Sequence, residues 1–231
     1  MYKFIFFTCL LLLGLTAQPQ ILLSLLLGDK LNSPGIEFGL EGGVNFTNIS
    51  GFESNSSLPD LNLGLYFDIL VKDQWYLYTG VQVKSSLGIR KLTENDLAFL
   101  QADTYNVKGN YKQKVNGFMV PLLANYKFKN HFYVEAGPQL GLLYNSWVQY
   151  NSHENKKDVK IKDYNEGMIN WFNAGLAAGA GYKLMNGNGI TIGIRYYQAF
   201  TDVFKDKSGS RNNAFHIKVN IPVGANRAEK K

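Results

Sequence analysis

Eight segments between residues 35 and 223 place apolar residues at every second position, and this alternation constrains the fold more than any other feature of the chain. A period of two is the period of a β-strand, whose successive side chains point to opposite faces of a sheet. Each segment therefore has one apolar face and one face of polar or small residues. The segments span residues 35–48, 61–71, 75–90, 113–128, 131–150, 168–184, 189–200 and 214–223.

The stretch YVEAGPQLGLLY at residues 133–144 shows the pattern and leaves two architectures open. Its even-numbered residues from Val134 to Leu142 are apolar, whereas the odd-numbered ones include Glu135 and Gln139. In a soluble barrel of the lipocalin type the apolar face lines the interior, and in a membrane barrel it faces lipid. Pro138 has no amide hydrogen, so it predicts a bulge or an unpaired position in this strand.

The links between the segments favour the membrane barrel. Short links with the sequences KDQ, KNH and MNGNG follow the second, fourth and sixth segments, and longer polar links follow the others. Outer-membrane barrels alternate tight periplasmic turns with longer extracellular loops in this way, and their strand number is even. The sequence therefore predicts an all-β fold, an eight-stranded antiparallel up-and-down transmembrane β-barrel over residues 35–224 with four extracellular loops. The long links lie at 49–60, 92–112, 151–166 and 201–213.

The two ends of the chain are expected to lie outside the barrel. Residues 1–17 combine Lys3, an apolar run and a small-residue ending, which is typical of a secretory signal peptide. Residues 225–231 form a polar C-terminal tail. For residues 18–34 three alternatives stay open: a signal anchor, a plug that enters the barrel, and a short periplasmic helix. The polar break QPQ between the two apolar runs favours the short periplasmic segment, and its apolar part is too short to span a bilayer as a helix.

Composition narrows the function classes. The single cysteine, Cys9, lies in the signal peptide, so the mature chain is expected to have no disulfide and no thiolate chemistry. The net charge of +6 is modest, and the lysine-rich stretch at 153–163 is more typical of a solvated loop than of a nucleic-acid site. No metal-ligand spacing, phosphate loop or dinucleotide motif is present. The sequence therefore predicts no cofactor, no metal and no nucleic-acid partner.

Several stretches resemble the PorT-like outer-membrane β-barrel family of diderm bacteria. The resemblance runs in order from about residue 36 to 223, and it implies an outer-membrane barrel of the porin family. It implies no shared reaction, because the stretches consist of glycine, aromatic and apolar residues that mark strands. They are IEFGLEGGVNF (36–46), VPLLANYKF (120–128), YVEAGPQLGLL (133–143), GLAAGAGYKL (175–184) and IRYYQAFTDVF (194–204).

The polar strand faces collect charged residues on the inside of the predicted barrel. Four acids and five permanent bases predict a cross-strand network of ion pairs. An eight-stranded barrel is just wide enough for side chains to fill it, which favours a plugged interior over a narrow charged pore. The predicted lumen residues are Glu37, Glu41, Asp68, Lys84, Arg90, Lys127, Glu135, Arg195, His216 and Lys218.

The sequence predicts a non-enzymatic protein of the bacterial outer membrane, a structural barrel or narrow pore that is monomeric and surrounded by lipid. An accessory component of an envelope or protein-secretion assembly, in contact with other envelope proteins, is the alternative. A lipid-modifying enzyme is disfavoured, because no triad order or nucleophile elbow connects its candidate residues. Those candidates are His131, His153, His216, Ser85, Ser86 and Ser146. A short helix is also expected at 94–103, with Leu97 and Leu100 on one side.

Overall fold

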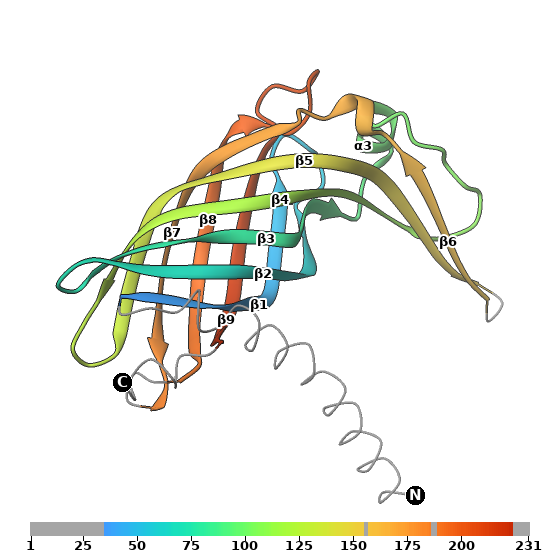
Figure 1. The fold of residues 1–231 in the computed structure, drawn as a ribbon. Helices are drawn as coiled ribbons and strands as arrows, with labels where there is room; N and C mark the ends of the chain where they lie inside the picture. Colours follow the sequence, from blue (N-terminus) through green and yellow to red (C-terminus); the bar gives the residue numbers. More distant parts are fainter. Residues whose placement is uncertain (1–34, 155–156, 186–188, 224–231) are drawn as a thin grey trace, which may run out of the picture.

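The computed structural model describes residues 35–154, 157–185 and 189–223, which form one antiparallel β-barrel (Figure 1). The predicted signal peptide (1–17), periplasmic segment (18–34) and C-terminal tail (225–231) lie outside the described residues. The strands are β1 (Ile36–Ile49), β2 (Ser56–Lys72), β3 (Trp75–Arg90), β4 (Asn110–Lys127), β5 (Phe132–Glu154), β6 (Lys157–Tyr164), β7 (Phe172–Lys183), β8 (Thr191–Asp202) and β9 (Arg211–Pro222). Two short helices are α3 (Glu94–Phe99) and η2 (Glu166–Met168).

Eight of the strands close into a ring. The hydrogen-bonded order is β4, β3, β2, β1, β9, β8, β7 and β5, and β5 pairs back onto β4. All of these pairings are antiparallel, including that of the first strand, β1, with the last, β9. Closure leaves none of the eight strands with an open edge along the barrel wall. The predicted eight-stranded antiparallel barrel is confirmed.

A ninth strand replaces a predicted loop. Residues 151–166 were expected to be a polar link, but β5 continues to Glu154 and β6 pairs with its last part, from Trp147 opposite Tyr164 to Glu154 opposite Lys157. The resulting hairpin extends past the barrel wall (Figure 1). Lysine and aspartate residues dominate this stretch and hide the alternation of Val159 and Ile161 that a strand requires.

The short and long links lie at opposite ends of the barrel. We call the end with the links 73–74, 128–131 and 184–190 the turn end, and the opposite end the loop end. The predicted link 49–60 is shorter than expected, because β2 already begins at Ser56. Among the described residues, no helix has the length and apolarity needed to cross a membrane.

The outer face of the ring carries an apolar band. Along β5 the exposed residues run from Phe132 at the turn end to Tyr144 near the loop end. Twelve steps of roughly 3.3 Å along a strand tilted by about 45° cover about 28 Å across the membrane. Outer-membrane barrels have an outward apolar band about 25 Å tall between aromatic girdles. The apolar face of the alternating pattern therefore lies on the outside of the ring, where outer-membrane barrels carry their apolar band.

Bulges exchange the two faces of a strand at the loop end. The register between β3 and β4 shifts between Gln82 and Ser85. Beyond this shift Leu87 and Ile89, which the alternation assigned to lipid, are buried in the interior. A bulge adds one residue to a strand, so every later side chain changes face.

Pro138 interrupts pairing without shifting it. The Cα pairing of β5 with β4 omits Gly137 and Pro138, and the register on either side is the same. The predicted unpaired position is therefore present on the β4 side, whereas on the β7 side Pro138 keeps Leu176 as its Cα partner. The register shift in this pair lies instead between Asn116 and Gly117 of β4.

An apolar cluster fills the loop-end half of the interior, and α3 closes it. Thr93 and Asp96 form a capping box that fixes the start of α3, and Leu97 and Leu100 are buried. The predicted short helix is therefore confirmed over Glu94–Phe99, and it ends before the predicted residue 103. The rings of Phe52, Phe99 and Phe204 meet edge-on below the helix, with centroids 5.5–5.9 Å apart. The cluster contains Ile49, Leu87, Ile89, Leu92, Leu97, Leu100, Val115, Met119, Leu143, Val148, Ile169, Val203 and Phe204.

Candidate functional site

Two acids and two bases form a buried ion cluster at the centre of the barrel. Arg195 Nε of β8 lies 2.7 Å from Glu135 Oε1 of β5, and Lys218 Nζ of β9 lies 3.0 Å from the same carboxylate. Glu41 of β1 completes the cluster, with Oε2 3.6 Å from Arg195 Nη1 and 3.8 Å from Lys218 Nζ. The charges balance, as a charge cluster removed from water requires. We call these four residues the ion tetrad.

Aromatic and amide side chains hold the tetrad in place. Tyr78 donates a hydrogen bond to Glu41, and Gln82 Nε2 donates another at 2.5 Å. Asn220 Nδ2 donates to Tyr78 Oη at 2.9 Å. Lys218 Nζ lies 4.2 Å from the centre of the Tyr78 ring, where the negative face of the ring stabilises the ammonium. The tetrad is thus fixed from several strands at once.

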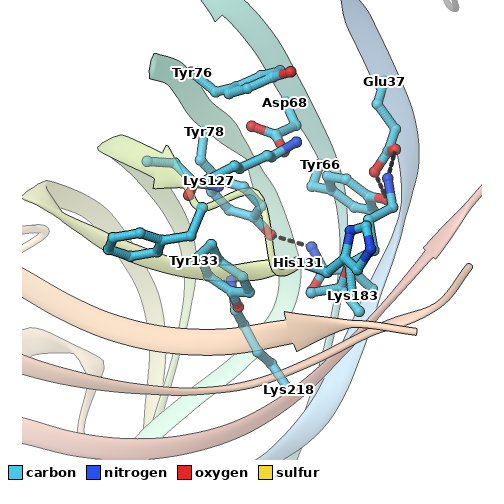
Figure 2. Close-up of a pocket in the computed structure, with 14 residues that line it drawn as sticks. Glu37, Tyr66, Asp68, Tyr76, Tyr78, Lys127, His131, Tyr133, Lys183 and Lys218 are labelled. Carbon is cyan, nitrogen blue, oxygen red and sulfur yellow. Dashed lines mark hydrogen bonds and ion pairs between the residues drawn. The ribbon is translucent and has the colours of Figure 1, made fainter. Parts of the chain in front are cut away.

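A cavity of about 170 Å³ opens below the tetrad at the turn end (Figure 2). Glu37 pairs with Lys183 and accepts a hydrogen bond from Tyr66 Oη at 2.8 Å. Asp68 pairs with Lys127 at 2.5 Å. Figure 2 shows Asp68 and Lys127 in the upper middle of the view, Glu37 and Lys183 at its right, and Tyr133 and Lys218 below them. Each of these carboxylates therefore has a cation beside it.

The structure brings seven of the ten predicted lumen residues into these ion pairs. His216 is also inside, where it pairs across the strands with Arg195, and neither of its ring nitrogens has a hydrogen-bond partner among the described residues. The seven are Glu37, Glu41, Asp68, Lys127, Glu135, Arg195 and Lys218.

Lys84 and Arg90 were assigned to the lumen incorrectly. Both are exposed, and the bulge in β3 explains why, since it reverses the predicted face of the residues from Lys84 onward. Lys183, which pairs with Glu37, was missed. Lys183 lies on the same face of β7 as Gly179 and Gly181, because all three have odd residue numbers. This numbering could have predicted that Lys183 points into the lumen, although the alternation in β7 is weak.

Two of the three serines considered for lipid-modifying chemistry, Ser86 and Ser146, bond to amide side chains. Ser146 Oγ accepts from Gln113 Nε2 at 2.7 Å and donates to Asn165 Oδ1 at 2.6 Å. Ser86 Oγ donates to Asn116 Oδ1 at 2.8 Å. Within the part of the chain that the structure describes, no group of three or more His, Cys, Asp or Glu side chains is placed to hold a metal ion.

A closed ring of antiparallel strands, apolar outside and ion-paired inside, defines a transmembrane β-barrel. The family model described as "Outer membrane protein beta-barrel domain" matches residues 28–205, more than half of the chain. The chain belongs to this family, and its location is the outer membrane. The narrower resemblance to PorT-like proteins is not part of this match.

Solved outer-membrane proteins are similar to the chain. Neisserial surface protein A is 8% identical, with a TM-score of 0.42 over 82% of this chain and 98% of that chain. The attachment invasion locus protein Ail of Yersinia pestis, in complex with the heparin analogue sucrose octasulfate, is 8% identical, with a TM-score of 0.41 over 83% and 99%. OprG of Pseudomonas aeruginosa is 13% identical, with a TM-score of 0.33 over 83% and 95%. No curated protein sequence matches the chain.

Proposed function

We propose that this protein is a closed, non-enzymatic barrel of the outer membrane, a structural scaffold that presents its loop end to the outside. One observation carries the proposal. The side chains of Arg195 and Glu135 at the barrel centre are 0% exposed, and those of Lys218 and Glu41 are 1% and 2% exposed. A water-filled channel along the axis would have to pass these side chains and would leave them exposed.

The loop-end half of the interior supports closure independently. A solute that passed the tetrad would next meet the apolar cluster below α3, where a hydrated ion would lose its water without gaining polar partners. Two layers of different chemistry thus fill the barrel. This is the plugged form of the eight-stranded barrel, whose interior is just wide enough for side chains.

The ring supports a monomer surrounded by lipid, because its eight strands satisfy one another along the apolar band. The bonding of Ser86 and Ser146 to amides supports a non-enzymatic role. The sorting of short and long links supports periplasmic turns and an outward loop end. Export through a signal peptide at residues 1–17 belongs to the same proposal.

A second candidate function is an accessory role in an envelope or secretion assembly, and the hairpin favours it. Among the described strands β6 pairs only with β5, so one edge of β6 has free backbone groups. Such an edge can accept a strand from another protein. Lys160 and Lys162 on this strand oppose unspecific pairing, because charged side chains protect edge strands.

Liposome swelling tests the closed barrel. Liposomes that contain the folded protein are expected to swell in isosmotic sugar or amino-acid solutions no faster than protein-free liposomes. Heat-modifiable migration of the same sample on gels verifies that the barrel is folded, and a known porin serves as the positive control. Swelling that depends on solute size would contradict closure.

A further inference from the structure

The outer face of the loop end carries a cluster of cations. The bulge in β3 brings Arg90 to the outside, and the strand registers place it in one row with Lys112, Gln149 and Lys162. Lys114 lies in the neighbouring row on the membrane side, together with Trp147 and Tyr164. Lys160 lies in the neighbouring row on the opposite side, together with Asn151. Residues that are Cα partners across a sheet share a face. We call Arg90, Lys112, Lys114, Lys160 and Lys162 the basic face.

The basic face begins directly above the apolar band. Phe118 and Tyr144 are 41% and 52% exposed, and their ring centroids lie 5.1 Å apart. Along β4 toward the loop end, Lys114 lies four residues from Phe118 and Lys112 lies six residues from it. At roughly 3.3 Å per residue and a tilt of about 45°, these positions lie about 9 and 14 Å beyond the last lipid-facing pair. This is the depth of the polar headgroups.

Aromatic residues join the cations at this level. Trp147 is buried below Lys162, whose Nζ is 4.3 Å from the ring centroid, and Lys114 Nζ is 5.9 Å away. Tyr164 is exposed beside Trp147. The indole Nε1 of Trp147 has no hydrogen-bond partner among the described residues, so a donor is unsatisfied within the face. Tryptophan and tyrosine are enriched where membrane proteins contact headgroups.

Carboxylates neutralise the basic face only in part. Asp60 Oδ2 pairs with Lys114 Nζ at 2.6 Å. Asp158 lies on the same face nearer the hairpin tip, and Asp163, on the opposite face of β6, accepts a hydrogen bond from the Asp103 amide. The positive charges of Lys114 and Lys160 repel that of Lys112, and the charge of Asp60 acts in the opposite sense. Like charges on one face of a sheet destabilise it, and an external anion would remove this repulsion.

We infer that the basic face binds the phosphate groups of phosphorylated glycolipids in the leaflet around the loop end. Phosphate oxygens accept paired hydrogen bonds from an arginine fork and single ones from lysines, and both kinds of donor are present. The depth of the face places these donors among headgroups, and the apolar band below holds the acyl chains. This inference rests on the proposed lipid-embedded orientation and deepens it by naming a lipid class.

Binding of diphosphorylated lipid A to the folded protein in neutral detergent micelles tests the inference. The wild-type protein is expected to retain this lipid through gel filtration in a salt-sensitive manner and to retain the dephosphorylated lipid far less. The triple variant Arg90→Gln, Lys112→Gln, Lys162→Gln is expected to bind on the order of a hundredfold more weakly, since each cation near an anionic surface contributes about fivefold. Lys114 is left intact because it pairs with Asp60.

A matched triple variant controls for net charge. Lys72→Gln, Lys129→Gln and Lys205→Gln remove three exposed lysines outside the basic face and are expected to leave binding unchanged. Heat-modifiable migration must show that both variants are folded. Equal retention of phosphorylated and dephosphorylated lipid would overturn the inference, as would equal loss in the two variants. Equally tight binding of soluble inorganic pyrophosphate would overturn the assignment to lipid. Lipid binding in micelles does not depend on whether the barrel interior is closed. The lipid-binding inference and the proposed closed barrel can therefore be contradicted independently of each other.

Discussion

Replacement of Lys218 by methionine is expected to lower the free energy of unfolding by about 3–5 kcal/mol, because it leaves buried carboxylates without their full complement of positive charge. Lys218 lies within 4 Å of both Glu41 and Glu135, and its side chain is 1% exposed. Adding Glu135→Gln removes one charge of the opposite sign and leaves Arg195 facing Glu41. The double variant is therefore expected to recover much of the lost stability.

Urea unfolding of the protein in lipid vesicles, followed by tryptophan fluorescence, measures these changes. Lys72→Met at the exposed end of β2 is the matched control, and surface changes of this kind shift stability by about 0.5 kcal/mol or less. If Lys218→Met were as mild as Lys72→Met, the tetrad would not be a closely coupled ion cluster. If the double variant were the least stable, charge balance would not be what holds it together.

Replacement of Phe204 by alanine is expected to cost about 3–5 kcal/mol, since it removes a large buried ring and leaves a cavity. Phe204 is 1% exposed and contacts the rings of Phe52 and Phe99, the latter on α3. The substitution is expected to weaken mainly the packing of α3 against the apolar cluster at the loop end. The link 91–109 is therefore expected to become much more sensitive to protease in the folded barrel.

Limited proteolysis with mass spectrometry locates this effect. Phe200→Ala removes the same side chain from the lipid-facing surface of β8, where Phe200 is 57% exposed, and is expected to leave cleavage of the link unchanged. Equal protease resistance in Phe204→Ala and the wild type would show that α3 does not depend on the apolar cluster.

The strand ring was predictable because alternation and link length report on it directly. Trp75–Arg90 has the predicted bounds, and most other strands differ by a few residues at each end. The hairpin of β5 and β6 was not predictable in this way. Lysine and aspartate residues surround Val159 and Ile161 in its outer strand and obscure the alternation. This strand is stabilised by pairing with β5 and not by a buried face of its own.

The residues that face the lumen were predictable only on strands where inward and outward side chains alternate without interruption. Glu135, Arg195 and Lys218 lie on strands without a bulge before them, so their predicted face is correct. Arg90 follows the bulge in β3, and no residue type near Gln82 predicts that a bulge is present. The same bulge brings Leu87 and Ile89 into the interior, which is why the apolar layer at the loop end has no simple signal in the sequence.

The specific partners within the tetrad required the register of the closed barrel. Glu135 is 60 residues from Arg195 and 83 from Lys218 in the chain. Alternation gives the face of each residue, whereas its depth along the axis depends on every strand pairing around the ring. Glu41 meets both bases because β1 closes the ring onto β9.

Single-channel recording in planar bilayers tests the central claim most directly, namely that side chains close the barrel at the ion tetrad. Protein whose folding has been verified by its heat-modifiable migration is expected to insert without producing stable current steps in concentrated salt. Reproducible steps of uniform size, present with the wild-type protein and absent from detergent controls, would contradict a closed interior.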